Sequence, residues 1–312
     1  MQFGFFVHNI PHFCCMKVLI TGGSGLIGNR ITQLLLEKGV EVVHLTRHLN
    51  SKSGVKTYEW NWEKGTIDLK CFNEVTHIIH LAGAGIADKA WTTKRKRFLI
   101  KSRVHTIRLL FKHIEALDKL ESFISASGIG YYGARNTEEI FTTASQPHAD
   151  FIAKCCIQWE NAADLFKPYA RVVKFRTGIV LDKENGAIPK MSSSIKLGIG
   201  APLGNGEQYM PWIHIDDIAN LYIYALTNKM NGIYNAVSSQ HTTNKELTKE
   251  IAVQLNKKIR LKRVPSFLIK TIYGEMADIL LKGSRVNNEG LLKSGFKLEY
   301  PDVKSALKNV FN

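Results

Sequence analysis

Along the first part of the chain, segments with the hydrophobic pattern of a strand alternate with segments that have the pattern of a helix. Short, β-branched apolar runs predict buried strands, and between them apolar residues recur three and four positions apart, as on the buried face of a helix. A strand over 17–21 leads through a glycine-rich loop into a helix over 29–38, and a second strand follows over 40–46. This order predicts a parallel sheet covered by helices on both faces.

The alternation of strands and helices continues to residue 182 and then changes character. Further strands are predicted over 76–82, 122–127 and 171–181, with helices over 93–115 and 151–166. After 182 the predicted elements are helices over 216–227, 244–255 with Asn244 as the cap, and 266–282, and strands over 232–237 and 258–264. We predict an α/β, Rossmann-like, doubly wound domain over 16–182 and a smaller α+β C-terminal substrate lobe over 183–312, with 212–237 returning to the main sheet.

Residues 1–15 differ from the rest of the chain and carry no Lys or Arg. They therefore lack the basic region of a signal peptide and the arginines of a transit peptide. Because Met16 directly precedes a clean strand, we expect it to be the working start and residues 1–15 to be an appendage. The longest uncharged stretch, around 75–87, is too short to span a bilayer, so no membrane partner is expected.

The net charge says more about the expected partners than the hydrophobic content does. The chain has 312 residues, and 42 Lys and Arg against 27 Asp and Glu give a formal charge of +15. Such a charge favours phosphorylated or otherwise anionic ligands. The densest basic cluster, 94–97, has no interleaved aromatic residues, so a solvated helix face is favoured over nucleic-acid binding. The cysteines form no C-x-x-C pair, and we expect no metal site and a reducing, cytoplasmic compartment.

The glycine loop is the first candidate for chemistry. Gly22 permits a tight turn after the strand, Gly25 allows backbone to approach a pyrophosphate, and Gly28 lets the helix pack close to the sheet. The helix N-terminus supplies amide donors and a positive dipole end for a phosphate. The loop, with its strand and helix, predicts a dinucleotide site rather than a structural turn.

The end of the second strand points to the form of the dinucleotide. An NAD site usually has an acidic residue there to accept the ribose 2′-hydroxyl. This chain has Thr46-Arg47-His48 and no carboxylate. Arg47 could pair with a 2′-phosphate through its guanidinium, so NADP(H) is favoured. The alternative is that Arg47 only points to solvent.

Several segments together resemble the short-chain dehydrogenase/reductase superfamily, in its atypical, NAD-dependent epimerase-like branch. They are TGGSGLIG at 21–28, HLAGAGI at 80–86, SGIGYYG at 127–133, RTGIVL at 176–181 and PLGNGEQYMPWIHIDDIA at 202–219. The segment 264–286 resembles the C-terminal extension of that branch, which we place at about 255–305. The resemblance covers the chain from about Met16 to its end.

The resemblance implies a set of cofactor-binding positions and allows a homodimer through the helices at 93–115 and 151–166. The implied positions are Gly22, Gly25, Leu26, Ile27 and Gly28 at the pyrophosphate, Arg47 at the adenosine phosphate, Leu81, Ala82 and Gly83 at the ribose, and Ser125, Ala126 and Ser127 beneath the nicotinamide. The same resemblance places Ile179 and Val180 after the strand that closes the nicotinamide side.

The catalytic Tyr-x-x-x-Lys pair of the superfamily is missing. The tyrosine position reads Phe151, and Lys154 lies one position away from the lysine position, about 100° around the helix. Ser127, Tyr131 and Tyr132 are the remaining catalytic candidates, and we expect the segment 214–217 to be structural. The sequence favours an NADP(H)-binding oxidoreductase or epimerase-like protein acting on a phosphorylated or nucleotide-linked small molecule. The alternative is a non-catalytic NADP(H) sensor.

Overall fold

The computed structural model describes residues 16–47, 49 and 54–312. The expected appendage at 1–15 and His48 lie outside the described residues. An eight-stranded sheet in the order β11-β8-β6-β5-β1-β2-β3-β4 forms the centre of the fold. Its strands are β1 Lys17–Thr21, β2 Glu41–Thr46, β3 Lys56–Asn61, β4 Thr66–Ile67, β5 His77–His80, β6 Ser122–Gly128, β8 Arg171–Thr177 and β11 Gly232–Ala236.

All neighbouring strands of this sheet run parallel except β3 and β4, which are antiparallel. From β1 the chain adds β2 and β3 on one side, and from β5 it adds β6 and β8 on the other. The strand order therefore reverses between β1 and β5, and crevices at such points bind ligands in open α/β sheets. The predicted doubly wound sheet is confirmed.

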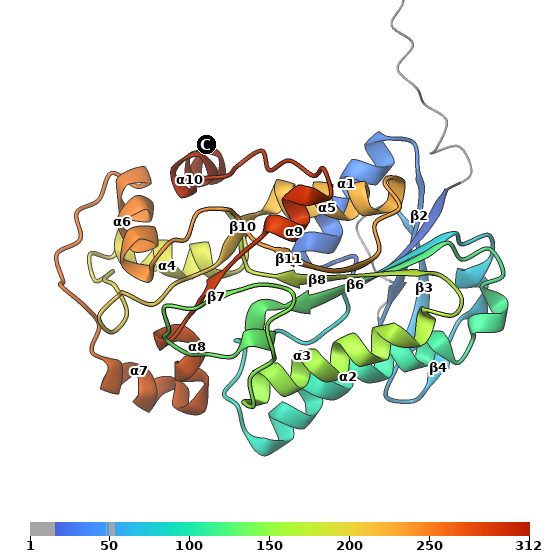
Figure 1. Ribbon diagram of the computed structural model, residues 1–312, viewed down its shortest axis with the longest axis horizontal. Helices are drawn as coiled ribbons and strands as arrows, with labels where there is room; N and C mark the ends of the chain where they lie inside the picture. Colours follow the sequence, from blue (N-terminus) through green and yellow to red (C-terminus); the bar gives the residue numbers. More distant parts are fainter. Residues whose placement is uncertain (1–15, 48, 50–53) are drawn as a thin grey trace, which may run out of the picture.

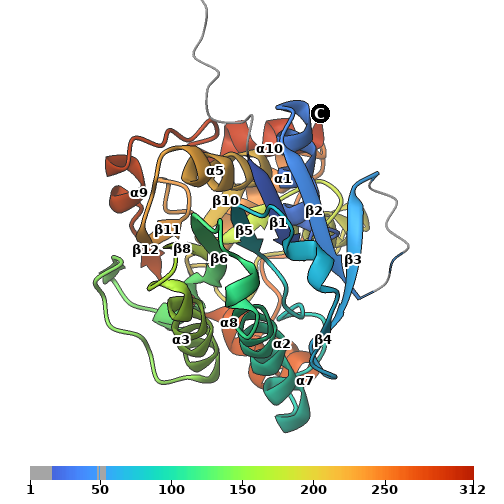
Figure 2. The same ribbon diagram turned by 90° about the vertical axis from the view of Figure 1, so that its right-hand side faces the viewer.

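Helices cover both faces of the sheet (Figures 1 and 2). Helices α1 Leu26–Glu37 and α5 Ile215–Thr227 pack together on one face, and α2 Thr93–Phe111 and α3 Phe151–Ala163 pack on the other. Each pair encloses an apolar core with the sheet: Ile31, Leu35 and Ile218 lie in one, and Leu110, Phe123 and Phe166 in the other. Strands buried on both faces explain the nearly continuous apolar runs in the sequence.

The predicted strand over 171–181 is wrong in one respect, because it divides at Gly178. The first part is β8, but β9, Ile179–Leu181, leaves the main sheet and pairs in parallel with β10, Trp212–His214. The Gly178 amide donates to the Ala236 carbonyl, and a Cβ at Gly178 would lie 2.6 Å from the Pro211 oxygen. This close crossing turns the chain out of the sheet. Of the segment 212–237, β11 joins the main sheet whereas β10 does not.

The C-terminal part adds a third apolar core beside β9 and β10. It is formed by α4 Ala187–Lys196, α6 Asn244–Gln254 and α10 Val303–Phe311, with Trp212, Leu247 and Leu307 buried among them. Shorter elements complete this region. They are α7 Ser266–Tyr273, the 3₁₀ turn η5 Gly274–Ala277, α8 Asp278–Leu281, α9 Glu289–Lys293, and the strand β12 Arg285–Val286, which pairs with β7 Ile140–Phe141.

Three local expectations for the C-terminal part are wrong. Residues 258–264 form no strand, because only Val264 finds a partner, an isolated bridge to Leu203. The expected helix over 266–282 is interrupted by η5. Helix α6 is capped by Thr243 in a capping box with Glu246, and the Asn244 side chain instead accepts a hydrogen bond from the Leu203 amide. No helix in the described part of the chain is long and apolar enough to cross a membrane.

Candidate functional site

The glycine loop lies at the switch point and is held by contacts that exclude side chains. Gly22 has a φ of +74°, and a Cβ there would lie 2.9 Å from the carbonyl carbon of Leu81. A Cβ at Gly28 would lie 2.7 Å from the Cα of Gly23 and would also collide with the Gly22 oxygen. The Gly25 amide closes the turn by donating to the Gly22 oxygen at 3.0 Å. The loop therefore needs glycine for its shape.

The N-terminus of α1 follows this loop and is built like an anion site. Its N-cap is Gly25, no side chain caps the helix, and its first turn contains no acidic residue. The first amide groups of a helix have no partner within it, and they carry the positive end of the helix dipole. The amides of Leu26 and Ile27 are thus available to a phosphate, and the loop fits the pyrophosphate of a dinucleotide.

The residues after β5 line the other side of the glycine loop. The Leu81 amide donates to the Thr21 carbonyl at 3.0 Å, and the Ala82 amide to Thr21 Oγ1 at 3.3 Å. Gly83 lies against the Arg103 side chain, whose guanidinium donates to the carbonyls of Leu99 and Ala84. The structure thus brings Leu81 and Ala82 next to Gly22.

A buried histidine beneath the loop was not predicted from the sequence. A Cβ at Gly23 would lie 2.5 Å from the His44 ring, whose Nε2 is 2.8 Å from Thr32 Oγ1. Burial lowers the pKa of His44 to about 4, so its imidazole is neutral at physiological pH. His44 is thus an uncharged packing residue between β2 and α1. In the sequence, His44 stands among the apolar residues of the predicted strand over 40–46, at a position that faces the interior.

Arg47 follows β2 and is exposed at the carboxyl end of that strand. Because β2 is the neighbour of β1, this is the same edge of the sheet that carries the glycine loop. The predicted serines lie further along that edge, in and at the end of β6. Ser125 is buried and its Oγ donates to the Ala126 carbonyl at 2.9 Å. Ser127 is buried and donates to Glu160 Oε1 at 2.7 Å.

A buried ion pair organises the region around Ser127. Arg176 on β8 donates to Glu160 on α3 through two bonds, Nε to Oε1 at 2.8 Å and Nη2 to Oε2 at 2.9 Å. The two side chains are 2% and 6% exposed. Burial alone would lower the pKa of Arg176, but its hydrogen bonds to Glu160 and the carboxylate charge outweigh burial and raise it. The Arg176 guanidinium is therefore held in its charged form. In the sequence, Arg176 and Glu160 each appear as a charged residue within an otherwise apolar strand or helix.

The two candidate tyrosines lie against this ion pair in different ways. The Tyr132 hydroxyl accepts a hydrogen bond from Arg176 Nη1 at 3.0 Å and donates to Asn235 Oδ1 at 2.6 Å. Tyr132 is only 1% exposed, and burial raises its pKa. The ring of Tyr131 packs on the guanidinium, with the Arg176 Cζ 3.3 Å from its centroid, and it is partly exposed. The structure thus brings Ser127, Tyr131 and Tyr132 into one cluster.

Helix α3 presents no titratable pair at the positions where the resemblance implies one. Phe151 begins the helix, and its ring packs against Trp91 at 5.0 Å between centroids. Cys155 follows one turn later and is 1% exposed, and burial raises the pKa of its thiol. A neutral thiol and a phenyl ring cannot replace the proton transfer of a tyrosine and a lysine.

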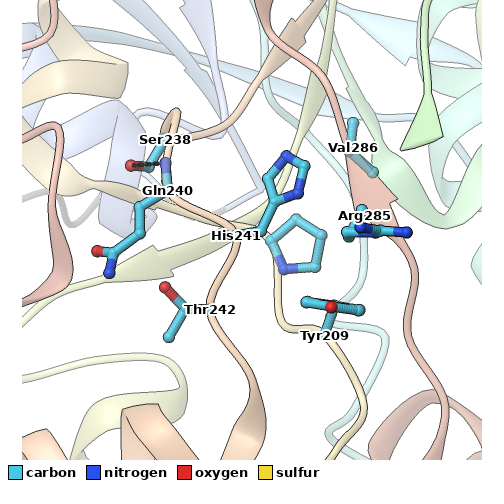
Figure 3. Close-up of a pocket in the computed structure, with 8 residues that line it drawn as sticks. Tyr209, Ser238, Gln240, His241, Thr242, Arg285 and Val286 are labelled. Atoms are coloured by element: carbon cyan, nitrogen blue, oxygen red, sulfur yellow. Dashed lines mark hydrogen bonds between the residues drawn. The ribbon is translucent and has the colours of Figure 1, made fainter. Parts of the chain in front are cut away.

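A small pocket that opens to solvent lies at the same edge of the sheet beyond β8 and β11. Figure 3 shows the side chains of Tyr209, His241 and Arg285 grouped together there. The Arg285 Cζ is 5.4 Å from the centroid of the Tyr209 ring, and Nη2 also pairs with Glu138 Oε2 at 2.8 Å. Burial, and then the charge of Arg285, lower the pKa of His241. No pattern in the sequence marked these three residues as functional.

The segment 214–217 joins the main sheet to the C-terminal part. His214 Nδ1 accepts from the Asp216 amide at 3.1 Å and so caps α5. Asp217 is 1% exposed and accepts from the amides of Glu299 and Tyr300 at 2.7 and 3.1 Å. These contacts are structural, as the sequence indicated. Among the described residues, no group of His, Cys, Asp or Glu is arranged to hold a metal ion.

A parallel sheet with a glycine loop at its switch point defines a Rossmann-type α/β fold. Residues 18–236 match the NAD dependent epimerase/dehydratase family, and residues 264–310 match a domain of unknown function, DUF1731. The chain therefore belongs to the NAD dependent epimerase/dehydratase family, and its resemblance to the atypical branch of the short-chain dehydrogenases is confirmed.

Three known proteins show how far the similarity extends. The mouse (Mus musculus) epimerase family protein SDR39U1 is 34% identical over 300 residues, which cover 95% of this chain and 99% of that protein. The crystal structure of human epimerase family protein SDR39U1 (isoform 2) with NADPH is 29% identical and covers 95% of this chain and 99% of its own, with a TM-score of 0.84. The nucleoside-diphosphate sugar epimerase from Corynebacterium glutamicum is 26% identical and has a TM-score of 0.77, over 95% of this chain and 58% of its own.

Proposed function

We propose that this protein binds NADP(H) along the carboxyl edge of its sheet and acts as an oxidoreductase or epimerase-like enzyme on an anionic small molecule. The observation that carries the proposal is the close packing of the glycine loop against Leu81, next to an uncapped helix N-terminus. Such a loop leaves room for a pyrophosphate only while Gly22 and Gly28 lack side chains. The similar human protein crystallised with NADPH supports this cofactor.

In this proposal, different groups of residues bind different parts of the cofactor. Gly22, Gly25, Leu26, Ile27 and Gly28 hold the pyrophosphate, Arg47 pairs with the 2′-phosphate, Leu81, Ala82 and Gly83 line the ribose, and Ser125, Ala126 and Ser127 support the nicotinamide. When bound, the nicotinamide supplies hydride transfer, so the protein has to orient the two reactants and handle a proton.

The pocket beside Tyr209 supports an anionic substrate. Arg285 provides a guanidinium and His241 an imidazole at the same opening, and the ring of Tyr209 lies next to them. A guanidinium recognises phosphate or carboxylate through paired hydrogen bonds. A phosphorylated or nucleotide-linked compound would fit this chemistry, and the similar protein from C. glutamicum is described as a nucleoside-diphosphate sugar epimerase.

Tyr131 is the proton carrier that this proposal favours among the candidates. Its ring is partly exposed, whereas the Tyr132 hydroxyl is already committed to Arg176 and Asn235. The Tyr131 ring stacks on the Arg176 guanidinium, which holds the phenol in the cluster with Ser127, and a general acid has to be positioned in this way. With a turnover substrate in hand, Tyr131→Phe should lower kcat by about a hundredfold and leave the Kd for NADPH unchanged. An unaltered kcat would exclude Tyr131 as the acid.

A non-catalytic NADP(H) sensor is the second candidate function, and the start of α3 favours it. Phe151 and the buried Cys155 occupy the positions of the catalytic pair, and neither can transfer a proton at neutral pH. Stopped-flow absorbance of the bound nicotinamide separates the two functions. An enzyme oxidises or reduces its cofactor with some carbonyl, hydroxyl or nucleotide-sugar compound, and a sensor does so with none. For either function we expect a small-molecule ligand, no nucleic-acid partner and a cytoplasmic location.

Arg47 provides the test of cofactor choice. Arg47→Ala should weaken NADPH binding by about tenfold to a hundredfold, because it removes a charge-assisted pair to the 2′-phosphate, and should change NADH binding less than twofold. Arg97→Ala on α2, another exposed arginine, serves as the matched control and should affect neither cofactor. Equal losses for NADPH and NADH, or no loss, would refute the role of Arg47. Fluorescence titration of the nicotinamide provides both dissociation constants.

A further inference from the structure

Helix α7, Ser266–Tyr273, exposes most of its apolar side chains. Of its residues only Ile269 is buried, while Phe267 is 66%, Leu268 44% and Ile272 70% exposed. Leu268 and Ile272 are four positions apart and share one face of the helix, and Phe267 lies about 100° from Leu268 around the axis. The three exposed side chains therefore lie on adjoining sides of the helix and form its exposed apolar face. A folded protein usually buries such a face, and an exposed one marks an interaction surface.

The position of α7 leaves this face uncovered by the other residues that the structure describes. Among the named elements its main packing partner is η5, the turn that follows it. Figure 1 shows α7 at the lower left edge of the molecule. An ion pair between Glu275 of η5 and Lys96 joins this region to the first turn of α2.

The surroundings of the apolar face are strongly cationic. The segment 257–270, which leads into α7 and includes most of it, contains six basic residues, and 257–274 contains no acidic one. These basic residues are Lys257, Lys258, Arg260, Lys262, Arg263 and Lys270, and all are exposed. The adjoining first turn of α2 adds the basic cluster 94–97. An anionic surface is therefore the electrostatic complement of this region.

We propose that α7 and the basic segment before it form a docking surface for an anionic lipid bilayer. Phe267, Leu268 and Ile272 enter the boundary between headgroups and acyl chains, with the helix lying in the plane of the membrane. The flanking lysines and arginines contact the anionic headgroups. The expectation of no membrane partner rested on the absence of a spanning stretch, and a helix that lies on the surface needs none.

The charges also disfavour a second copy of this chain as the occupant. A symmetric dimer through α7 would bring the same basic segments of two subunits together, and like charges at an interface oppose association. The face is a single projecting helix rather than a groove, so a protein partner would have to supply the complementary groove. A lipid surface requires no such shape.

Vesicle flotation of the full chain tests this proposal with two compositions, phosphatidylcholine alone and phosphatidylcholine mixed with phosphatidylglycerol. The protein should float with the mixed vesicles only and detach as salt is raised. Ile272→Ser and Arg263→Glu should each weaken binding by about tenfold, by removing apolar contact and by reversing a headgroup charge. Matched controls are Leu36→Ser, an exposed leucine on α1 on the opposite face of the sheet from α2, and Lys64→Glu, and neither should change binding.

Three results would overturn the proposal. Equal binding to neutral vesicles would remove the role of charge, and absence of binding to either composition would remove the lipid. A dimer that Ile272→Ser dissociates, measured by light scattering, would assign the face to a second copy. NADPH titration of the same variants should match the wild type, so failure of this proposal is distinguishable from failure of the cofactor site.

Discussion

Substitution of Gly28 by alanine tests the glycine loop directly, because the added methyl group has no space. Its Cβ would lie 2.7 Å from the Gly23 Cα and would overlap the Gly22 oxygen. Carbon atoms in contact are about 3.5–4.0 Å apart, so the loop or the helix has to move by about 1 Å. That movement displaces the amides of Leu26 and Ile27, which the proposed function assigns to the pyrophosphate.

The expected size of both effects follows from this contact. Overpacking of this kind costs about 1–3 kcal/mol of folding stability, partly offset by the better helix propensity of alanine, so the variant should still fold. Loss of one amide hydrogen bond to a charged phosphate is worth about 1.5–3 kcal/mol. NADPH binding of Gly28→Ala should therefore weaken by about tenfold to a hundredfold.

The control for this substitution is Gly290→Ala in α9, where nothing lies within 4 Å of the new methyl group. It should raise stability by about 0.5–1 kcal/mol through helix propensity and leave NADPH binding unchanged. Nicotinamide fluorescence gives the affinities, and thermal denaturation with circular dichroism verifies the fold. A Gly28→Ala protein that folds and binds NADPH as tightly as the wild type would refute the reasoning.

Two further predictions concern stability. Burial, aided at His77 and His80 by nearby arginines, lowers the pKa of His44 and His77 to about 4 and of His80 to about 3. The unfolded chain binds protons at these sites below about pH 6.5 while the folded chain does not, so stability falls as pH falls from about 6.5 toward 4, by about 2 kcal/mol per histidine at pH 5. Urea titrations from pH 7 to pH 5 measure this, and a flat profile would contradict the buried neutral imidazoles. Glu160→Gln should cost about 3–5 kcal/mol in the same assay, because it leaves the buried Arg176 without its counter-ion, and a loss below about 1 kcal/mol would contradict that account.

The parts of the fold that depend on local pattern could be predicted from the sequence. Strand β1, the glycine loop and β2 follow their predicted positions closely, because apolar runs and glycine spacing are local signals. Helix α1 begins at Leu26 rather than at 29, since its N-cap, Gly25, has no side chain to mark the start. The short strands β3 and β4 were missed, because their exposed positions weaken the apolar pattern.

Features that depend on contacts between distant segments could not be predicted. The chain divides into β8 and β9 at Gly178 because the backbone at residues 211 and 236 packs against that glycine. The sequence around 178 gives no indication of these distant contacts. The resemblance placed Ser127 beneath the nicotinamide, but its hydroxyl is bonded to Glu160, a residue 33 positions away. The pocket residues Tyr209, His241 and Arg285 come from three separate segments and meet only in the folded chain.

The most direct test of the central claim is a fluorescence titration of the purified wild-type protein with NADPH and with NADH at moderate salt. The account predicts saturable binding of NADPH and clearly weaker binding of NADH, because Arg47 is proposed to pair with the 2′-phosphate and no carboxylate follows at 46–50. Equal affinity for the two would contradict the assignment of Arg47. Absence of binding to either would contradict the cofactor site itself.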